Sequence, residues 1–564
     1  MMTVFSAVSA DERRWTHVLP LLFGIGLFAV FFLPFLGKAF HIDDSFFIDS
    51  AGLIGWNPLE ASPADYPYKG VVIRHYLPYE ASHPFLLPYM MKVVRAAFGE
   101  SERAMHAAFL IFPFMALIAL AKLTSLLFPA VNRKAFLVPL FLMAVPAFLV
   151  NAHNVMADVP TLALFLTSLA WYISAIEKER ALHAFVGSIF LSAAIFSSYQ
   201  MLALIPLVLI YAWKRQRLIL LTLVSLAVPV LCMVSWVLMI YSRYGIFPLI
   251  KSSLSVTGLD NASEIARGYG PGMFSDRAVS ILALLGTSLF FVFAVYAVCS
   301  AAWRRLAVMF GVGIVVMAVF FSLYASYPFF ETTLLSVLVT TALISLSEAV
   351  RLTYRAGESS PQRFFLLAWA LTVLGYNQFV LPFGSARYLL PAIPPLIMLL
   401  ISAIDWGRAK RSTLPVAAAF LLSALFGLAN AYADYFHAGT YREIAREVQQ
   451  FRSEKYGSPD VWYIGEWGMR YYLDSVGARY LLNDLRAPRK GDYLVIPEMP
   501  RFWQPHMLLT PRLQLYATRE FRSALPLKIF HRQSRAGFYA QHWGLLSFGF
   551  SQEPQERFEI WEVH

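Results

Sequence analysis

The sequence predicts an all-α polytopic membrane protein that ends in a small extracytoplasmic α/β domain. Of its 564 residues, 58% are hydrophobic and 14% are charged, and the mean hydropathy is +0.57. Soluble domains carry closer to a quarter charged residues, so this composition indicates a chain that lies mostly in a bilayer. About thirteen apolar runs have the length that a bilayer requires. From residue 435 onwards the composition changes to that of a soluble domain.

The apolar runs are separated by polar connections, which is typical of successive membrane-spanning helices. We expect the first run to be a retained helix, because no small-residue cleavage site closes it. The runs cover residues 18–36, 105–127, 135–151, 159–176, 182–197, 200–213, 218–241, 279–300, 306–325, 330–349, 364–381, 388–404 and 413–432.

The distribution of Lys and Arg predicts the side on which each connection lies. Basic residues gather in alternate connections, beginning with Arg13 and Arg14, whereas the short connections between them contain only Arg387. Cytoplasmic loops are enriched in Lys and Arg, so we expect a multi-pass protein of the inner (plasma) membrane with its C-terminal domain on the periplasmic side. The same placement of charge argues against nucleic-acid binding, although the net charge is +11.

We predict a membrane domain over residues 1–434 and a soluble domain over residues 435–564. The outer loop 38–104 should contain two helices that lie in the membrane surface. One is the aromatic segment Phe46 to Trp56, and the other is Leu86 to Phe98, which places its apolar residues on one helical face.

The C-terminal residues show the pattern of a small α/β domain. Tyr441 to Lys455 has an amphipathic period, and Trp467 to Val476 reads as a helix closed by Gly477. Val461 to Ile464 and Tyr493 to Ile496 have the composition of buried strands.

Two adjacent carboxylates, Asp43 and Asp44, follow the first apolar run. A carboxylate at this depth is costly unless a partner or a function retains it. Neighbouring residues of a helix do not face the same way. Asp44 can therefore cap a helix that begins at Ser45, while Asp43 acts as a general base or a metal ligand. The alternative is that both residues are interfacial helix caps.

Asp158 and Arg387 lie at other helix ends on the predicted outer side. Asp158 precedes Pro160 and suits the N-cap of the fourth apolar run, which is the plain structural interpretation of this residue. An outer Arg387 opposes the positive-inside tendency, and its guanidinium matches a phosphate. The alternative for Arg387 is that it reaches towards lipid headgroups.

A divalent metal ion is one option for this region, with Asp43, Asp158 and His83 as candidate ligands. The ligand spacing does not require a metal, and a lone loop histidine is most often only a polar loop residue. The sequence contains no Gly-rich phosphate loop, no HExxH and no Gly-x-Ser-x-Gly. Nucleotide-driven chemistry and serine hydrolysis are therefore not indicated.

Six short segments, taken in order, carry a resemblance to a known family. They are Asp43-Asp44, Ser82-His83-Pro84, Phe98-Gly99-Glu100-Ser101, Met156-Ala157-Asp158-Val159-Pro160, Ser197-Ser198-Tyr199-Gln200 and Arg387-Tyr388-Leu389-Leu390-Pro391. The sequence resembles the GT-C glycosyltransferases, membrane enzymes that use polyprenyl-phosphate sugars. Within them it resembles the bacterial group of protein O-mannosyltransferases and the lipid A aminoarabinose transferase, which is glycosyltransferase family 39-like. The resemblance covers roughly residues 15–430.

The resemblance implies a role for each candidate residue. Asp43 corresponds to the presumed catalytic base, Asp158 to the acid that helps to build the site, and Arg387 to a ligand of the donor phosphate. One departure is Ser198 before Tyr199, where many relatives have a Lys before the tyrosine. The same segments supply the substrate-binding candidates Asp44, His83, Asp158, Tyr199, Gln200, Arg387 and Tyr388.

The expected partners are a polyprenyl-phosphate-linked sugar donor, membrane lipid, and an acceptor that is a glycolipid, a polysaccharide or a protein. Two other functions fit a protein of this class. A multi-span transporter or flippase of lipid-linked saccharides should carry polar residues near the bilayer midplane, whereas the acids here gather at helix ends. A non-catalytic partner subunit would keep the fold without the activity.

Overall fold

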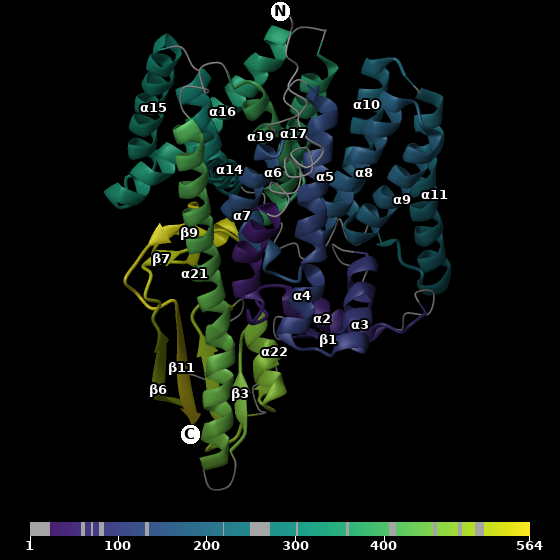
Figure 1. The fold of residues 1–564 in the computed structure, drawn as a ribbon. Coiled ribbons are helices and arrows are strands. Elements are labelled where there is room, and N and C mark those ends of the chain that lie inside the picture. Colours follow the sequence, from purple (N-terminus) through teal and green to yellow (C-terminus); the bar gives the residue numbers. More distant parts are fainter. Residues whose placement is uncertain are drawn as a thin grey trace, which may run out of the picture.

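A computed structural model shows a mostly helical chain with a small C-terminal sheet, which confirms the predicted fold class (Figure 1). The residues that the structure describes are 23–57, 63–68, 71–77, 84–129, 135–217, 219–248, 271–300, 303–356, 360–404, 406, 413–454, 459–482, 488–501 and 512–564.

Each predicted apolar run coincides with helix in the described part of the chain. Seven helices there are long and apolar enough to cross a membrane and three further apolar helices are shorter, so the number of spans stays a prediction. In chain order the helices are Phe23–Phe35, α4 (Glu102–Phe109), α5 (Ile111–Leu127), α6 (Leu137–Ala144), α7 (Pro146–Ala152), α8 (Asp158–Lys178), α9 (Ala181–Ser197), η3 (Tyr199–Leu204), α10 (Ile205–Arg215), α11 (Ile219–Tyr244), α14 (Pro271–Ser300), α15 (Trp303–Leu323), α16 (Phe329–Ala356), α17 (Pro361–Phe379), α18 (Ala386–Leu389), η5 (Leu390–Ala392), α19 (Ile393–Ser402) and α21 (Thr413–Glu454).

The bundle is packed most closely around α8 and around the contact of α14 with α16. Nearly all apolar residues of α8 are buried. A Cβ added at Gly286 of α14 would lie 1.9 Å from the carbonyl oxygen of Leu338 in α16, so only glycine permits this approach. By contrast, α15 exposes Val308 and Phe310, as expected of a helix that faces lipid.

The run 135–151 is divided at a proline, and this break leads the chain to the site. Val145 has extended backbone angles before Pro146, because a residue that precedes proline disfavours the helical region. After α7 the short segment 153–157 turns the chain into α8, which begins at Asp158.

Two short helices lie near one end of the bundle, and they coincide with the two helices predicted within residues 38–104. They are α2 (Asp44–Leu53) and α3 (Leu86–Phe98), with a β1 (Ala64–Tyr68) and β2 (Val71–Tyr76) hairpin between them (Figure 1). The hairpin falls within a Pro-rich stretch that the sequence pattern did not assign to strands. Gly99, with φ of 81°, ends α3, since the left-handed region favours glycine.

The C-terminal residues form the predicted α/β arrangement. α21 is a single helix of 42 residues, and the proposed boundary at residues 434 and 435 falls inside it. The sheet order is β4-β3-β5-β11-β6, with β3 parallel to its two neighbours and β11 antiparallel to both of its own. The elements are β3 (Val461–Tyr463), α22 (Gly468–Ser475), β4 (Arg479–Tyr480), β5 (Tyr493–Pro497), β6 (Leu513–Phe521), β7 (Leu527–Lys528), β8 (Phe530–His531), β9 (Ala536–Gly537), η7 (Gln541–Trp543), β10 (Gly549–Phe550) and β11 (Glu556–Val563).

Candidate functional site

Asp43 and Arg387, which are distant in the sequence, meet at one end of the helix bundle. Nη1 of Arg387 donates to Oδ2 of Asp43 over 2.5 Å. The side chain of Asp43 is 36% exposed and that of Arg387 is 10% exposed. Asp43 directly precedes α2, and Arg387 lies in the single turn of α18. The pair therefore joins the residues before α2 to α18, and its Asp43 side remains open to solvent.

The guanidinium of Arg387 is held on several sides without using all its donors. Nη2 lies 3.3 Å from the hydroxyl of Tyr388, and the ring of Tyr388 lies 5.0 Å from the guanidinium carbon. Nη1 also approaches the sulfur of Met156 at 3.5 Å. Nε is buried and has no hydrogen-bond partner among the described residues. Arg387 thus keeps a free donor next to its contact with Asp43.

Asp158 is the third charged group of this site. It is the first residue of α8, is 9% exposed, and interacts electrostatically with both Arg387 and Asp43. Its side chain does not cap α8, because the capping position belongs to Ala157 and lacks a side-chain hydrogen bond. Asp158 is thus the first residue of α8 rather than its N-cap, and its carboxylate accepts from its own backbone N–H while it interacts electrostatically with Arg387.

Asp44 differs from Asp43 in its burial and in its hydrogen-bond partners. Its side chain is fully buried, with Oδ2 accepting from the backbone N–H of His41 at 2.8 Å and Oδ1 from that of Val155 at 2.9 Å. Burial raises the pKa of Asp44 to about 7, against the opposing charge of Lys38 and the two backbone amides. The expectation that Asp44 caps α2 is wrong, because the helix begins at Asp44 itself and both oxygens are taken by other segments.

A buried polar cluster that sequence analysis did not single out lies behind these acids. Nζ of Lys38 contacts Oδ2 of Asp434 in α21 and Oδ1 of Asn154, and both charged side chains are about 1% exposed. The hydroxyl of Tyr539 donates to Asp434 at 2.9 Å and accepts from Asn154 at 3.0 Å. The available sequence signal was a lysine close to the outer end of the first apolar run.

Two histidines extend this cluster towards the C-terminal sheet. Burial lowers the pKa of His41 well below its ordinary value, and the charges of His437 and Lys38 act in the same direction. Nε2 of His437 lies 3.2 Å from Oε2 of Glu556. Glu556 also accepts from the backbone N–H groups of Glu498 and Met499. Buried polar residues of segment 38–41, of α21 and of β11 therefore lie together in one cluster.

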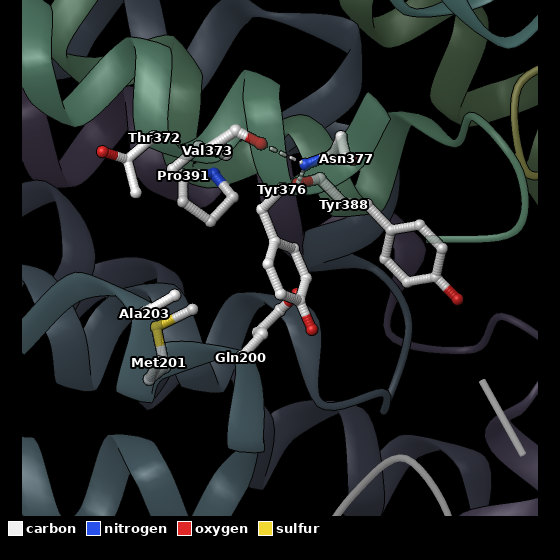
Figure 2. A pocket seen from close by; sticks show the side chains of 9 residues that line it. All are labelled: Gln200, Met201, Ala203, Thr372, Val373, Tyr376, Asn377, Tyr388 and Pro391. Carbon is white, nitrogen blue, oxygen red and sulfur yellow. Dashed lines mark hydrogen bonds between the residues drawn. The ribbon is translucent and has the colours of Figure 1, made fainter. Parts of the chain in front are cut away.

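A small, open pocket beside the charged site is lined by two of the predicted substrate-binding residues, Gln200 and Tyr388 (Figure 2). It lies between η3 and α17, with the ring of Tyr376 directed towards Gln200. The amide nitrogen of Asn377 donates to the carbonyl oxygens of Val373 and Tyr388, while its Oδ1 lacks a partner among the described residues. The remaining lining residues are Met201, Ala203, Thr372 and Pro391.

The other sequence candidates are less central. Tyr199 is buried, with its hydroxyl 3.5 Å from the indole nitrogen of Trp236. His83 lies outside the described residues. Within the described residues, groups of three or more His, Cys, Asp or Glu side chains that could hold a metal ion are not found. Asp43 and Asp158 supply two carboxylates next to an arginine, which is an incomplete ligand set for a metal.

Comparisons with known proteins give structural likenesses only. No family model and no curated protein matches the chain. The chain is similar to ArnT from Cupriavidus metallidurans bound to undecaprenyl phosphate, with 14% identity, a TM-score of 0.45, and coverage of 89% of this chain and 96% of that one. It is also similar to the archaeal oligosaccharyltransferase AglB from Archaeoglobus fulgidus in complex with an inhibitory peptide and a dolichol-phosphate. There the identity is 13%, the TM-score is 0.48, and the coverage is 86% of this chain and 70% of that one.

Proposed function

We propose that this protein is an integral membrane glycosyltransferase that moves a sugar from a polyprenyl-phosphate donor to an acceptor outside the cytoplasm. The observation that carries this proposal is the contact of Asp43 with Arg387, which unites a candidate base and a candidate phosphate ligand. The two residues are 344 positions apart, and neither is needed to cap its own helix. The sequence resemblance described above supports the same chemistry.

Two properties of Arg387 suit the phosphate of the sugar donor, namely its positive charge and its Nε–H group. A guanidinium offers a planar set of N–H groups that matches phosphate oxygens, and Nε of Arg387 lacks a partner among the described residues. A bound phosphate would accept the hydrogen bond from Nη1 that Asp43 now accepts. Binding of the sugar donor would thereby free the carboxylate of Asp43 to interact with the sugar acceptor.

The proposed reaction needs one base and one group that stabilises the leaving phosphate. The acceptor hydroxyl gives its proton to the carboxylate of Asp43 as its oxygen bonds to the anomeric carbon of the sugar. The bond between that carbon and the phosphate oxygen breaks, and its electron pair leaves with the polyprenyl phosphate. Arg387 stabilises the charge that develops on this phosphate. An acceptor that is itself an ionised phosphate needs no base, and Asp43 would then orient the reacting groups.

The remaining candidates have supporting places in this proposal. Tyr388 contacts the guanidinium of Arg387, and the negative charge of Asp158 stabilises it electrostatically. Gln200 and Tyr388 line the neighbouring pocket, where they can contact the donor beside its phosphate. Asp44 is enclosed and both of its oxygens are engaged, so we assign it to the support of Asp43 rather than to substrate contact.

The position of the site agrees with a donor whose lipid tail stays in the bilayer. Asp43, Asp158 and Arg387 lie at helix ends, and hydrogen bonds join the residues before Arg387 to the C-terminal domain. In Figure 1, α2 lies at the end of the bundle that faces the C-terminal domain. We propose that this side is the periplasmic one, as the charge distribution of the connections predicts. A reporter enzyme fused after His564 should be active in the periplasm, and activity in the cytoplasm instead would reject this orientation.

Transfer by the purified protein tests the proposed function directly. The protein in detergent is incubated with defined polyprenyl-phosphate sugars and cell-envelope extract, and products are identified by mass spectrometry. We expect an acceptor mass increased by one sugar residue and release of polyprenyl phosphate, both strongly reduced with Asp43→Asn. Movement of an intact donor across proteoliposomes without sugar transfer would instead indicate a flippase.

A further inference from the structure

The last residues of the chain reach back to the candidate site from two sides. Segment 538–541, which follows β9 and ends at the first residue of η7, packs against the residues that precede Arg387 and against the polar cluster of Lys38. Phe538, Tyr539 and Gln541 are each at most 5% exposed. In Figure 1 this part of the chain lies beside α21, near the level at which the membrane helices end.

On the first side, segment 538–541 holds the backbone that leads into Arg387. The N–H of Ala386 donates to the carbonyl of Phe538 at 2.9 Å, and the N–H of Gln541 donates to the carbonyl of Gly384 at 3.1 Å. The side-chain oxygen of Gln541 accepts from the N–H of Gly384 at 2.8 Å. Three hydrogen bonds therefore link the start of α18 and the residues before it to segment 538–541.

The approach at Gly384 leaves little room for any other arrangement. A Cβ at this position would lie 3.1 Å from Oγ of Ser280 and 3.2 Å from Oε1 of Gln541. The amide nitrogen of Gln541 donates in turn to the carbonyl of Met273 at 3.1 Å, which ties it to α14. The backbone before Arg387 is thus enclosed between α14 and the C-terminal domain.

On the second side, Tyr539 holds the segment that leads into Asp158. Its hydroxyl bridges Asn154 and Asp434. Asn154 is followed by Val155, whose N–H donates to Asp44. The position of this segment relative to Asp43 therefore depends on a hydroxyl that the C-terminal domain supplies.

We propose that Gln541 and Tyr539 of the C-terminal domain are positioning residues of the transfer site, Gln541 for Arg387 and Tyr539 for the Asp43 and Asp158 side. This inference rests on the proposed function, because it assigns the two residues to donor binding and turnover respectively. It means that the C-terminal domain is a structural part of the site. A buried backbone donor or acceptor without a partner is unfavourable, so these contacts favour the observed position of the Arg387 segment.

The variants Gln541→Met and Tyr539→Phe test the two assignments separately in the full-length protein. Gln541→Met keeps the length of the side chain and leaves the N–H of Gly384 without its acceptor. We expect faster amide hydrogen exchange over residues 383–390 and a roughly tenfold weaker apparent affinity for a polyprenyl-phosphate sugar, the scale of one buried hydrogen bond. Tyr539→Phe removes only the hydroxyl, and we expect a lower turnover number with little change in donor affinity.

Matched controls come from the same domain. Gln555→Met alters another buried glutamine, which contacts Phe530, and Tyr463→Phe removes another buried hydroxyl, which contacts Asp474. We expect both controls to lower thermal stability by similar amounts without changing exchange over residues 383–390, donor affinity or turnover.

The outcomes separate this inference from the proposed function. Unchanged exchange over residues 383–390 in Gln541→Met, or equal effects in the controls, would overturn the positioning roles. Altered exchange with unchanged donor affinity in an active enzyme would also overturn them. A wild-type protein that transfers no sugar would instead reject the proposed function, and the exchange measurement would still decide whether Gln541 holds the Arg387 segment.

Discussion

Lys38 and Asp43 are only five residues apart, and each forms an ion pair with a distant residue, yet the surroundings of the two pairs differ. Asp43 meets Arg387 at the rim of the bundle, where the carboxylate is 36% exposed. Lys38 meets Asp434 inside the protein, where both side chains are about 1% exposed. Each pair ties the same short segment to a helix that occurs more than three hundred residues later.

The difference in burial indicates a difference in role. An enclosed pair needs further hydrogen-bond partners, and Asn154 supplies one to Lys38 while Tyr539 supplies one to Asp434. In the other pair Asp43 is partly exposed, so its carboxylate can exchange Arg387 for solvent or for a ligand at a lower cost. We infer that Lys38 and Asp434 hold the structure together, whereas Asp43 and Arg387 are available for chemistry.

The largest expected effect is on stability, from breaking the enclosed pair. Lys38→Met leaves the carboxylate of Asp434 buried without its cation, which typically costs about 3–5 kcal/mol. Thermal unfolding in detergent should show a large fall in Tm for Lys38→Met and a partial recovery in Lys38→Met/Asp434→Asn. A Tm equal to that of the wild type would show that this pair does not hold the structure.

Asp43→Asn should produce the opposite pattern, a loss of activity without a loss of stability. Asn is similar in shape but cannot accept the proton, so turnover should fall on the order of a hundredfold or more. The matched control is Asp49→Asn in α2, the helix that follows Asp43, since the side chain of Asp49 is 32% exposed and near Arg470. Equal and mild effects from both variants would contradict the role of Asp43 as the base.

Asp44→Asn should lower stability, as expected for an enclosed residue, although Asp44 is adjacent to Asp43. An amide has one acceptor oxygen and cannot accept from both His41 and Val155, so one backbone N–H loses its partner at a cost of about 1–3 kcal/mol. Chemical or thermal unfolding measures this loss. A stable Asp44→Asn protein with the activity loss of Asp43→Asn would reverse our assignment of the two acids.

The pH dependence of stability provides a second measurement on Asp44. Burial raises its pKa to about 7, above the ordinary value of about 4, so the folded state binds this proton more tightly than the unfolded state. The contribution of Asp44 to the free energy of unfolding should be complete below about pH 4 and decrease as the pH rises towards 7. Asp44→Asn should remove this part of the slope, and an unchanged slope would contradict the raised pKa.

Arg387→Lys should have the smallest effect. A lysine keeps the charge but replaces the planar set of donors by a single ammonium group. The loss of one charge-assisted hydrogen bond to the donor phosphate corresponds to roughly tenfold weaker apparent affinity. A donor titration measures this change, and an unchanged titration for Arg387→Ala would favour an interfacial role for Arg387.

The sequence alone predicts the helices well, because apolar runs and the residues that end them are local features. It also indicates that Asp43, Asp158 and Arg387 lie at helix ends, and the structure brings these three together. The β1–β2 hairpin was missed because its strands contain proline and tyrosine without a clear alternation. The continuous helix α21 was divided because its composition changes where it leaves the bundle, while its backbone does not.

What the sequence by itself determined is the class of protein and the residues that sit at the ends of its helices. Only the tertiary structure decided which acid of the adjacent pair meets Arg387 and which is enclosed. Successive helical residues point in different directions, and the partners that distinguish them come from distant segments, Val155 for Asp44 and Arg387 for Asp43. The C-terminal contacts at Gly384 and Asn154 are likewise decided by packing, since local sequence does not encode a hydrogen bond across more than a hundred residues.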